Sequence, residues 1–197
     1  MPTIQRIIWD KFKINRRDSL PFKTWNSDRT HLAELFNELG YKTGAEIGVS
    51  YGYYSRVLCE KIPDLKLYCV DPWHAHHYYG FMTEEKAEGL YQQAKKNLEG
   101  LNVEFVRKKS TEAVLDFKDA SLDFVYIDAL HDFDNIMLDL IHWTPKVKPG
   151  GIVSGHDYMV VFRCGVIPAV DLYTRMHNIS LYYVTNEPKA SFFWVRE

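Results

Sequence analysis

The chain has 197 residues, of which 46% are hydrophobic, 15% aromatic and 25% charged, and its formal net charge is −2 at pH 7. This composition excludes disordered and collagen-like chains and supplies enough apolar side chains for one large core. The even charge balance argues against a protein that binds nucleic acid through bulk positive charge.

The charges are unevenly distributed along the chain. Residues 1–30 carry seven basic and three acidic side chains, a net charge of +4, so the rest of the chain carries −6. We therefore distinguish a basic N-terminal segment, residues 1–27, from one domain that covers residues 28–197. The sequence does not decide between three roles for the segment, which are a substrate lid, an arm toward a second subunit and a loose tail.

The cysteines and the N-terminus indicate the compartment. Cys59, Cys69 and Cys164 are widely spaced and form no C-x-x-C pair, which indicates neither a disulfide framework nor a zinc knuckle. The apolar run at residues 7–9 is too short for a signal peptide or a membrane span. We expect a cytoplasmic protein with no membrane contact.

Helical and strand patterns alternate from about residue 28 onward. Ser27 is the expected cap of the first helix, which ends at Gly40. The apolar face of this helix follows the i, i+3, i+4, i+7 spacing, at Leu32, Leu35, Phe36 and Leu39. Five strands follow at residues 45–49, 65–70, 103–107, 123–128 and 151–155, and an antiparallel pair closes the chain at 181–185 and 192–195. The helices between them cover residues 54–61, 83–99, 135–143 and 166–176, and a short helix opens at 110–112.

This alternation predicts an α/β fold with a Rossmann-like, doubly wound sheet. We expect a mostly parallel, seven-stranded sheet with an antiparallel C-terminal strand and with helices on both faces. Ligands of such sheets bind at the carboxyl ends of the strands, near the point where the strand order reverses.

Two features at these strand ends favour a ligand that contains a nucleoside. The first strand runs into a turn in which the small residues Gly48, Ser50 and Gly52 let a ligand approach the backbone, and the next helix presents free N–H groups. About twenty residues later, Asp71 closes the second strand, where a carboxylate can accept hydrogen bonds from both ribose hydroxyls.

Two carboxylates are expected to converge at the next two strand ends. Asp128 ends the fourth strand and Asp157 follows the fifth, so the two strand ends lie roughly 5 Å apart if the strands are neighbours. Such a pair needs a cation or a shared proton, and a hard divalent ion such as Mg²⁺ fits. His156 would point to the opposite face from Asp157 if the strand continued. In the alternative interpretation, Asp128 caps the following helix and Asp157 binds backbone amides.

Histidines offer two further hypotheses. His131 lies three residues beyond Asp128, where a neutral imidazole can take the proton of a substrate hydroxyl, although a structural histidine is an alternative. His74, His76 and His77 form a cluster without a fourth zinc ligand, so we interpret their loop as a lid rather than a zinc site.

The turn also spells G-x-S-x-G, and Asp128 and His156 follow Ser50 in the order found in serine hydrolases. In that fold several strands and an oxyanion-hole loop precede the turn, whereas here the turn follows the first strand and no HGGG-like segment lies upstream. A serine hydrolase is therefore the weaker alternative.

The ordered motifs EIGVSYGYYS, YCVDPW, KKST, DFVYIDALHDF and KPGGIVSGHDY resemble those of the class I S-adenosylmethionine-dependent methyltransferases. The closest resemblance is to the small-molecule O-methyltransferase-like branch, and it makes residues 28–197 a class I methyltransferase domain. One departure is Ser50, which stands where the family's turn has its middle glycine.

The resemblance implies S-adenosylmethionine as the cofactor. It places Glu46, Gly48 and Ser50 at the methionine part, Asp71 at the ribose, Pro72 and Trp73 at the adenine, and Ser110 at the adenine edge. Tyr51 and Asp128 complete the expected cofactor-binding set.

The resemblance also implies methyl transfer to an oxygen of a small-molecule acceptor, with Asp128 and His131 as catalytic residues. Mg²⁺ or another divalent cation would be held by Asp128, Asp157 and His156. A cofactor-binding module without catalysis is the alternative function. A nucleic-acid acceptor is not favoured, and a homo-oligomer is an open option.

Overall fold

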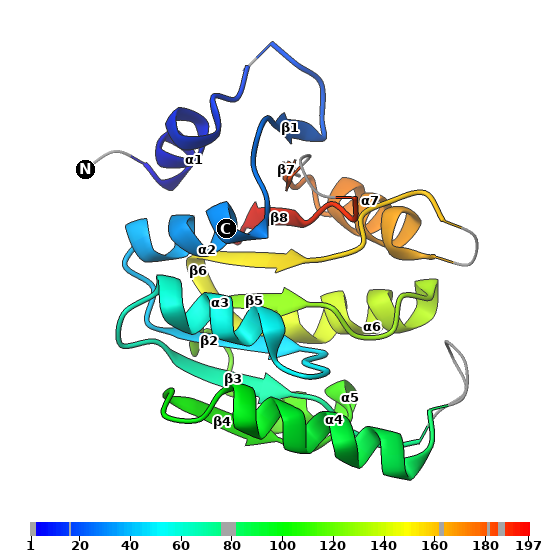
Figure 1. Cartoon of the computed structure of the whole chain (residues 1–197). Helices are drawn as coiled ribbons and strands as arrows, with labels where there is room; N and C mark the ends of the chain where they lie inside the picture. Colours follow the sequence, from blue (N-terminus) through cyan, green and yellow to red (C-terminus); the bar gives the residue numbers. More distant parts are fainter. Residues whose placement is uncertain (1–2, 16, 76–81, 162–163, 181, 185–187) are drawn as a thin grey trace.

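The structure is a computed structural model that describes residues 3–15, 17–75, 82–161, 164–180, 182–184 and 188–197. Eight strands form one sheet in the order β1-β7-β8-β6-β5-β2-β3-β4 (Figure 1). The strands are β1 Phe22–Thr24, β2 Thr43–Ile47, β3 Lys66–Val70, β4 Val103–Val106, β5 Leu122–Ile127, β6 Val147–Gly155, β7 Tyr182–Val184 and β8 Phe192–Val195. Neighbouring strands are parallel except where β8 pairs with β6 and β7. The expected doubly wound sheet with an antiparallel C-terminal strand is confirmed.

Helices cover both faces of this sheet. They are α1 Ile4–Phe12, α2 Arg29–Glu38, α3 Tyr53–Lys61, α4 Glu84–Asn97, α5 Ser110–Ala113, α6 Phe133–Trp143 and α7 Val166–Met176, with 3-10 turns η1 Val114–Asp116 and η2 Thr144–Lys146. Most of these elements lie within a few residues of their predicted bounds. Among the described helices, none is long and apolar enough to span a membrane.

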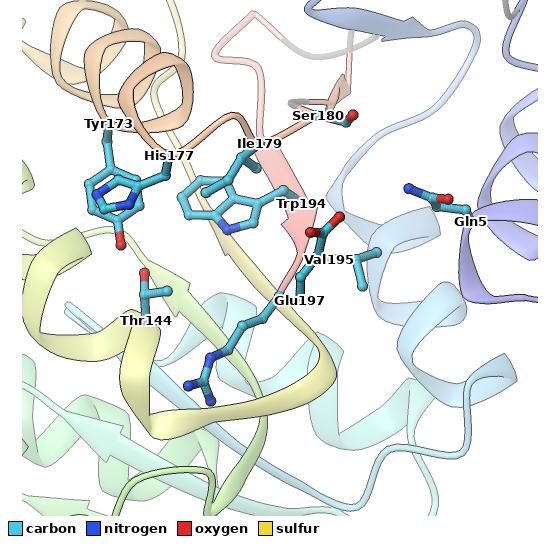
Figure 2. A pocket seen from close by; sticks show the side chains of 10 residues that line it. Gln5, Thr144, Tyr173, His177, Ile179, Ser180, Trp194, Val195 and Glu197 are labelled. Atoms are coloured by element: carbon cyan, nitrogen blue, oxygen red, sulfur yellow. The ribbon is translucent and has the colours of Figure 1, made fainter.

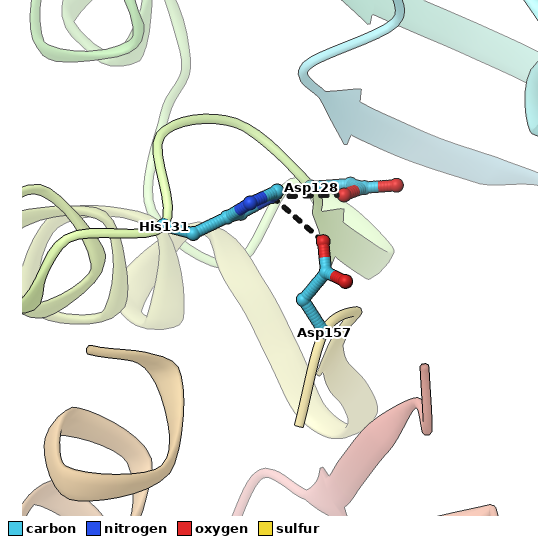
Figure 3. A group of neighbouring side chains, drawn as sticks. All are labelled: Asp128, His131 and Asp157. Carbon is cyan, nitrogen blue, oxygen red and sulfur yellow. Dashed lines mark hydrogen bonds and ion pairs between the residues drawn. The ribbon is translucent and has the colours of Figure 1, made fainter. Parts of the chain in front are cut away.

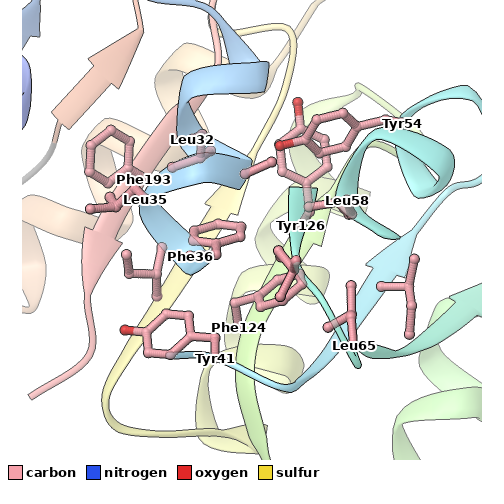
Figure 4. Packing of buried hydrophobic residues seen from close by; sticks show 14 of the residues in the cluster. Leu32, Leu35, Phe36, Tyr41, Tyr54, Leu58, Leu65, Phe124, Tyr126 and Phe193 are labelled. Atoms are coloured by element: carbon pink, nitrogen blue, oxygen red, sulfur yellow. The ribbon is translucent and has the colours of Figure 1, made fainter. Parts of the chain in front are cut away.

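The alternation of side chains along β5 divides the core into two layers. Phe124 and Tyr126 pack against α1 to α4, whereas Val125 and Ile127 pack against α5 to α7. Figure 4 shows the first layer, in which the ring of Phe36 stacks on Phe124 with centroids 4.4 Å apart. Because both faces of the strand are buried, nearly every residue of β5 is apolar, which is the pattern that predicted the strand.

The N-terminal segment contributes two elements that the sequence did not predict. Ile8 and Phe12 of α1 are buried, and the ring of Phe12 lies 5.6 Å from that of Phe193 in β8. β1 adds an eighth strand by pairing with β7. Lys11 reaches α2, where its Nζ lies 2.6 Å from an oxygen of Glu38. The described part of the segment therefore belongs to the core and the sheet; a role as a lid or an arm is a separate proposal.

The cap of α2 differs from the predicted one by one residue. Asp28 caps the helix, since its Oδ1 accepts from the amides of Thr30 at 2.8 Å and His31 at 3.2 Å. The predicted cap, Ser27, is buried and donates instead to the hydroxyl of Thr24 at 2.9 Å. Both residue types cap helices well, so the choice depends on the path of the preceding chain.

Candidate active site

A cavity of about 390 Å³ lies over the carboxyl ends of β2, β3 and β5. It is bounded by the loops that follow these strands and by parts of α4, α5 and α6. Its lining residues are Ile47, Gly48, Ser50, Val70, Asp71, Pro72, Trp73, His74, Met82, Ala87, Leu90, Lys109, Ser110, Thr111, Asp128, Ala129, Leu130, Asn135 and Asp139. The volume and the mixed apolar and polar lining suit a nucleoside-sized ligand.

The turn after β2 brings backbone to the edge of this cavity. Gly48 has a φ of +89°, and a Cβ there would lie 2.1 Å from the carbonyl oxygen of Asp128. Only glycine fits such a position. Ser50 has a φ of +53°, so the residue that departs from the family's glycine adopts a backbone conformation that glycine favours.

Asp71 fastens this turn to β3. Its Oδ2 accepts from the amides of Val49 at 3.0 Å and Ser50 at 2.9 Å, and its Oδ1 accepts from the amide of Trp73 at 2.8 Å. A carboxylate accepts about four hydrogen bonds, so Asp71 retains capacity for about one more, toward the cavity that it lines. It shapes the turn in addition to its predicted role at a ribose.

The residues predicted at the adenine line the same cavity. The Trp73 indole donates to the carbonyl of Ser50 at 2.7 Å, and its ring packs 4.9 Å from that of Tyr91. Ser110 accepts from the indole of Trp143 at 2.7 Å and donates to Asp139.

Asp139 is a buried cavity residue that the sequence reasoning missed. It lies on the apolar face of α6, one helical turn from Ile136 and from Trp143. An acidic residue on such a face was the signal that could have identified it.

Two predicted cofactor residues do not line the cavity. Ile47 faces the cavity, so the preceding Glu46 points to the opposite layer, where its carboxylate accepts from the Ser55 hydroxyl. Burial raises the pKa of Glu46 to about 8, against the opposing effect of the Ser55 hydrogen bond. Tyr51 is 42% exposed, and its ring lies 5.3 Å from that of Tyr53.

Asp128 connects the cavity to a cluster of titratable side chains. The Nε2 of His131 lies 3.3 Å from Oδ1 of Asp128 and 3.0 Å from Oδ2 of Asp157 (Figure 3). Each of these three residues offers a metal-binding atom within 4.8 Å of the others. The Nδ1 of His156 lies 3.5 Å from Asp128 and 3.8 Å from Asp157, and Lys189 Nζ lies 3.3 Å from Asp157.

The backbone explains why these side chains meet. Ile127 pairs with Gly155, so β5 and β6 end side by side and their next residues converge, as expected. β6 ends at Gly155 and Asp157 has a φ of +56°, so strand alternation no longer applies. His156 and Asp157 therefore do not point to opposite faces, and both approach Asp128.

The structure shows neither of the alternative roles, in which Asp128 caps the following helix and Asp157 binds backbone amides. Asp132, rather than Asp128, caps α6 and accepts from the amide of Asn135 at 3.1 Å. Within the described residues, no backbone amide donates to Asp157, whose Oδ1 is buried without a hydrogen bond. The Asp157 carboxylate is instead surrounded by His131, His156 and Lys189.

The charge state of Asp128 suits this environment. Burial favours a higher pKa, but the hydrogen bonds of His131 and His156 outweigh burial and hold the pKa of Asp128 below its usual range. An ionised Asp128 beside an imidazole can orient a base or bind a cation.

Other predicted sites are less well supported. No described histidine makes a hydrogen bond to the Ser50 hydroxyl, and His156 lies beside Asp128 and Asp157 instead, so a serine hydrolase triad does not form among the described residues. His74 lines the cavity, but His76 and His77 of the predicted lid lie outside the described residues.

Figure 2 shows a second cavity, of about 210 Å³, beside Trp194 and Thr144. It lies toward the amino end of β6. Its lining residue Val195 pairs with Ile152, whereas Phe192 pairs with Gly155 at the carboxyl end of that strand. None of its lining residues belongs to the cluster around Asp128.

Comparisons with known proteins agree with this geometry. Residues 45–158 match the family described as "Methyltransferase domain". A curated relative, "Uncharacterized protein y4gI" of Sinorhizobium fredii, is 30% identical over 147 residues, which are 70% of this chain and 14% of that protein. The chain thus spans about one seventh of the length of this relative.

Solved structures share the fold at low identity. An O-methyltransferase from Bacillus cereus, solved in complex with SAH, has a TM-score of 0.62 at 16% identity, covering 98% of this chain and 90% of that chain. An O-methyltransferase family protein from Burkholderia thailandensis has a TM-score of 0.63 at 14% identity, covering 86% of this chain and 55% of that chain.

Proposed function

The chain belongs to the class I S-adenosylmethionine-dependent methyltransferases, and from this premise we propose that it methylates an oxygen of a small-molecule acceptor. The observation that carries the proposal is the position of Asp128, which lines the cavity and also contacts His131. A methyl donor in the cavity would thus lie next to a group that can accept a proton.

The cavity residues fit an adenosyl cofactor. Gly48 lets the turn pack against the backbone of Asp128, Ser50 lines the cavity, and Asp71 has a remaining acceptor position for a ribose hydroxyl. Pro72, Trp73 and Ser110 are proposed to border the adenine. Glu46 and Tyr51 would act only indirectly, through the shape of the turn.

The proposed reaction requires little covalent chemistry from the protein. The sulfonium of the cofactor supplies an electrophilic methyl group, so the protein must hold the acceptor oxygen in line with it. We propose that His131 takes the proton of the acceptor hydroxyl. The carboxylates of Asp128 and Asp157 would orient the imidazole and stabilise its protonated form, which is the role of acidic partners of catalytic histidines.

The same cluster is a candidate divalent-cation site. Asp128, His131 and Asp157 are the proposed ligands, with His156 close to both carboxylates. In this alternative state of the site, His131 would hold the cation, and the cation rather than the imidazole would activate the acceptor hydroxyl. A bound cation would lower the pKa of a coordinated hydroxyl. The prediction was Mg²⁺ or another divalent cation, and a set of two carboxylates and one imidazole suits a divalent transition ion better than it suits Mg²⁺.

Methyl transfer tests the proposal directly. The protein is incubated with S-adenosylmethionine bearing a deuterated methyl group and with panels of phenols, sugars and hydroxy acids, and products are identified by mass spectrometry. We expect a labelled methyl ether or ester that His131→Asn fails to form. Cofactor binding without transfer to any acceptor class would favour the non-catalytic module, and a labelled nitrogen or carbon would contradict oxygen as the target.

A further inference from the structure

The cavity shown in Figure 2 is a separate pocket to which the proposed methyl transfer gives no role. Among the described residues, it shares no lining residue with the cavity over β2, β3 and β5. Its walls come from distant parts of the chain, since Thr144 lies in η2, Tyr173 in α7 and Trp194 in β8. Figure 2 shows that these three side chains point toward the same space. The pocket is therefore formed by the tertiary structure rather than by one loop.

Two polar atoms at this pocket are buried without a hydrogen-bond partner among the described residues. They are the indole nitrogen Nε1 of Trp194 and the hydroxyl oxygen Oγ1 of Thr144. Trp194 is 0% exposed, so bulk water does not reach its N–H group. Buried polar groups are nearly always hydrogen-bonded, because an unpaired one costs free energy. An indole only donates, so the partner that completes this pocket must present an acceptor atom.

The charges at the pocket favour a negatively charged acceptor. The amide of Arg196 donates to the carbonyl of Gly151 at 2.8 Å, so the pairing of β8 with β6 continues past Trp194. Residues two apart on a strand share a face, which places the Arg196 guanidinium on the same face as the Trp194 indole. Its Nη1 donates to the carbonyl of Val147, and a guanidinium has further N–H groups for a ligand. Glu197 follows on the opposite side and is exposed, so solvent screens its charge.

Aromatic and aliphatic side chains form the remaining wall of the pocket. The ring of Tyr173 lies 5.9 Å from that of Trp194 and 4.4 Å from that of His177, and Ile179 also lines the space. An imidazole is neutral or positively charged, so His177 does not repel an anion. The volume of about 210 Å³ is below that of sites for drug-sized ligands, which measure about 300 to 1,000 Å³. The pocket therefore suits a single ring.

We propose that this pocket binds a small aromatic carboxylate. A carboxylate oxygen would accept from the Trp194 indole and the Thr144 hydroxyl, and the ring would pack against Tyr173. The Arg196 guanidinium would balance the charge. Hydrogen bonds to an ionised acceptor are stronger than those to a neutral one, which favours the acid over an ester or an amide. The inference does not depend on the proposed function, because it requires neither an adenosyl cofactor nor the cluster around Asp128.

Titration with benzoate, which is one ring bearing one carboxylate, tests the inference. Proton–nitrogen correlation NMR of the labelled protein resolves the indole N–H groups of its five tryptophans, and Trp194→Phe identifies the resonance of Trp194. We expect this resonance to shift to a saturating value, with a dissociation constant in the millimolar range or tighter. Benzamide keeps an acceptor oxygen but carries no charge, so it should bind at least about fivefold more weakly.

Substitutions of the polar side chains test their separate roles. Thr144→Val removes the hydroxyl and Arg196→Leu removes the guanidinium, and each should weaken benzoate binding at least about fivefold. Arg175→Leu is the matched control, because it removes an exposed arginine of α7 that does not line the described pocket, and it should keep the wild-type affinity. S-adenosylhomocysteine should leave the benzoate affinity unchanged, since the two cavities share no described lining residue.

Several outcomes would overturn the inference. A Trp194 resonance that shows no saturable shift would leave water as the occupant of the pocket. Unchanged affinity in both Thr144→Val and Arg196→Leu, or competition with S-adenosylhomocysteine, would mean that benzoate binds elsewhere. Equal binding of benzamide would contradict a carboxylate as the ligand. If Trp194→Phe does not fold, the benzoate affinities of the other two variants relative to Arg175→Leu decide the question.

Discussion

Replacing Glu46 by Gln should stabilise the protein, and the gain should increase with pH. The Glu46 carboxyl is 2% exposed, and burial raises its pKa from an ordinary 4.5 to about 8. The folded protein therefore keeps a proton that the unfolded chain loses above pH 4.5. Each pH unit between these two values costs the folded state about 1.4 kcal/mol. At pH 7 the accumulated cost is on the order of 3 kcal/mol, and it stops growing above the folded pKa.

Glutamine has nearly the same shape and can still accept the hydrogen bond of Ser55. It carries no titrating proton, so its stability should not fall over this pH range. Urea denaturation followed by circular dichroism at pH 5, 6, 7 and 8 measures the free energy of unfolding of both proteins. We expect a difference below about 1 kcal/mol at pH 5 that rises to about 3 kcal/mol at pH 7.

The matched control is Glu99→Gln, at an exposed position after α4, which should shift stability equally little at every pH. A Glu46→Gln effect that is constant from pH 5 to pH 8 would refute the reasoning, because Glu46 would then be ionised in the folded state.

Four further predictions follow from the site and the core. His131→Asn should lower kcat by about 10²- to 10⁴-fold while leaving the affinity for S-adenosylhomocysteine within about twofold, as measured by steady-state kinetics and calorimetry. A parallel loss of affinity would contradict a role of His131 at the acceptor rather than at the cofactor. Gly48→Ala should abolish cofactor binding, because its Cβ would lie 2.1 Å from the carbonyl oxygen of Asp128 and would push apart two residues that line the cavity. Retained binding by a folded variant would disprove this close contact between Gly48 and Asp128. EDTA should remove activity that Mn²⁺ or Mg²⁺ restores, and Asp157→Asn should weaken that restoration; full turnover in EDTA would exclude the metal and leave methyl transfer standing. Ile8→Ala should reduce the free energy of unfolding by about 2 to 5 kcal/mol, since Ile8 is fully buried, and a change below about 0.5 kcal/mol would show that α1 does not belong to the core.

The sequence was most informative where a functional residue directly follows a buried strand. Gly48, Asp71 and Asp128 come immediately after apolar runs, so predicting the strands also placed these residues at one edge of the sheet. The convergence of Asp128 and Asp157 followed from the same argument once β5 and β6 were taken as neighbours. Local pattern and sheet topology together determine these positions.

Contacts between distant segments were not visible in the sequence. Phe12 is buried because it meets Phe193 near the other end of the chain, and β1 is a strand only because β7 lies beside it. Asp157 approaches His131 through a left-handed backbone conformation that no residue type required. Asp139 joins the cavity through its contact with Ser110 on another helix.

The central claim is that the cavity beside Asp128 binds an adenosyl cofactor. Isothermal titration of the folded wild-type protein with S-adenosylhomocysteine tests it most directly. The structure predicts saturable binding with one ligand per chain. No detectable binding at millimolar ligand, in a sample shown to be folded by circular dichroism, would contradict the claim.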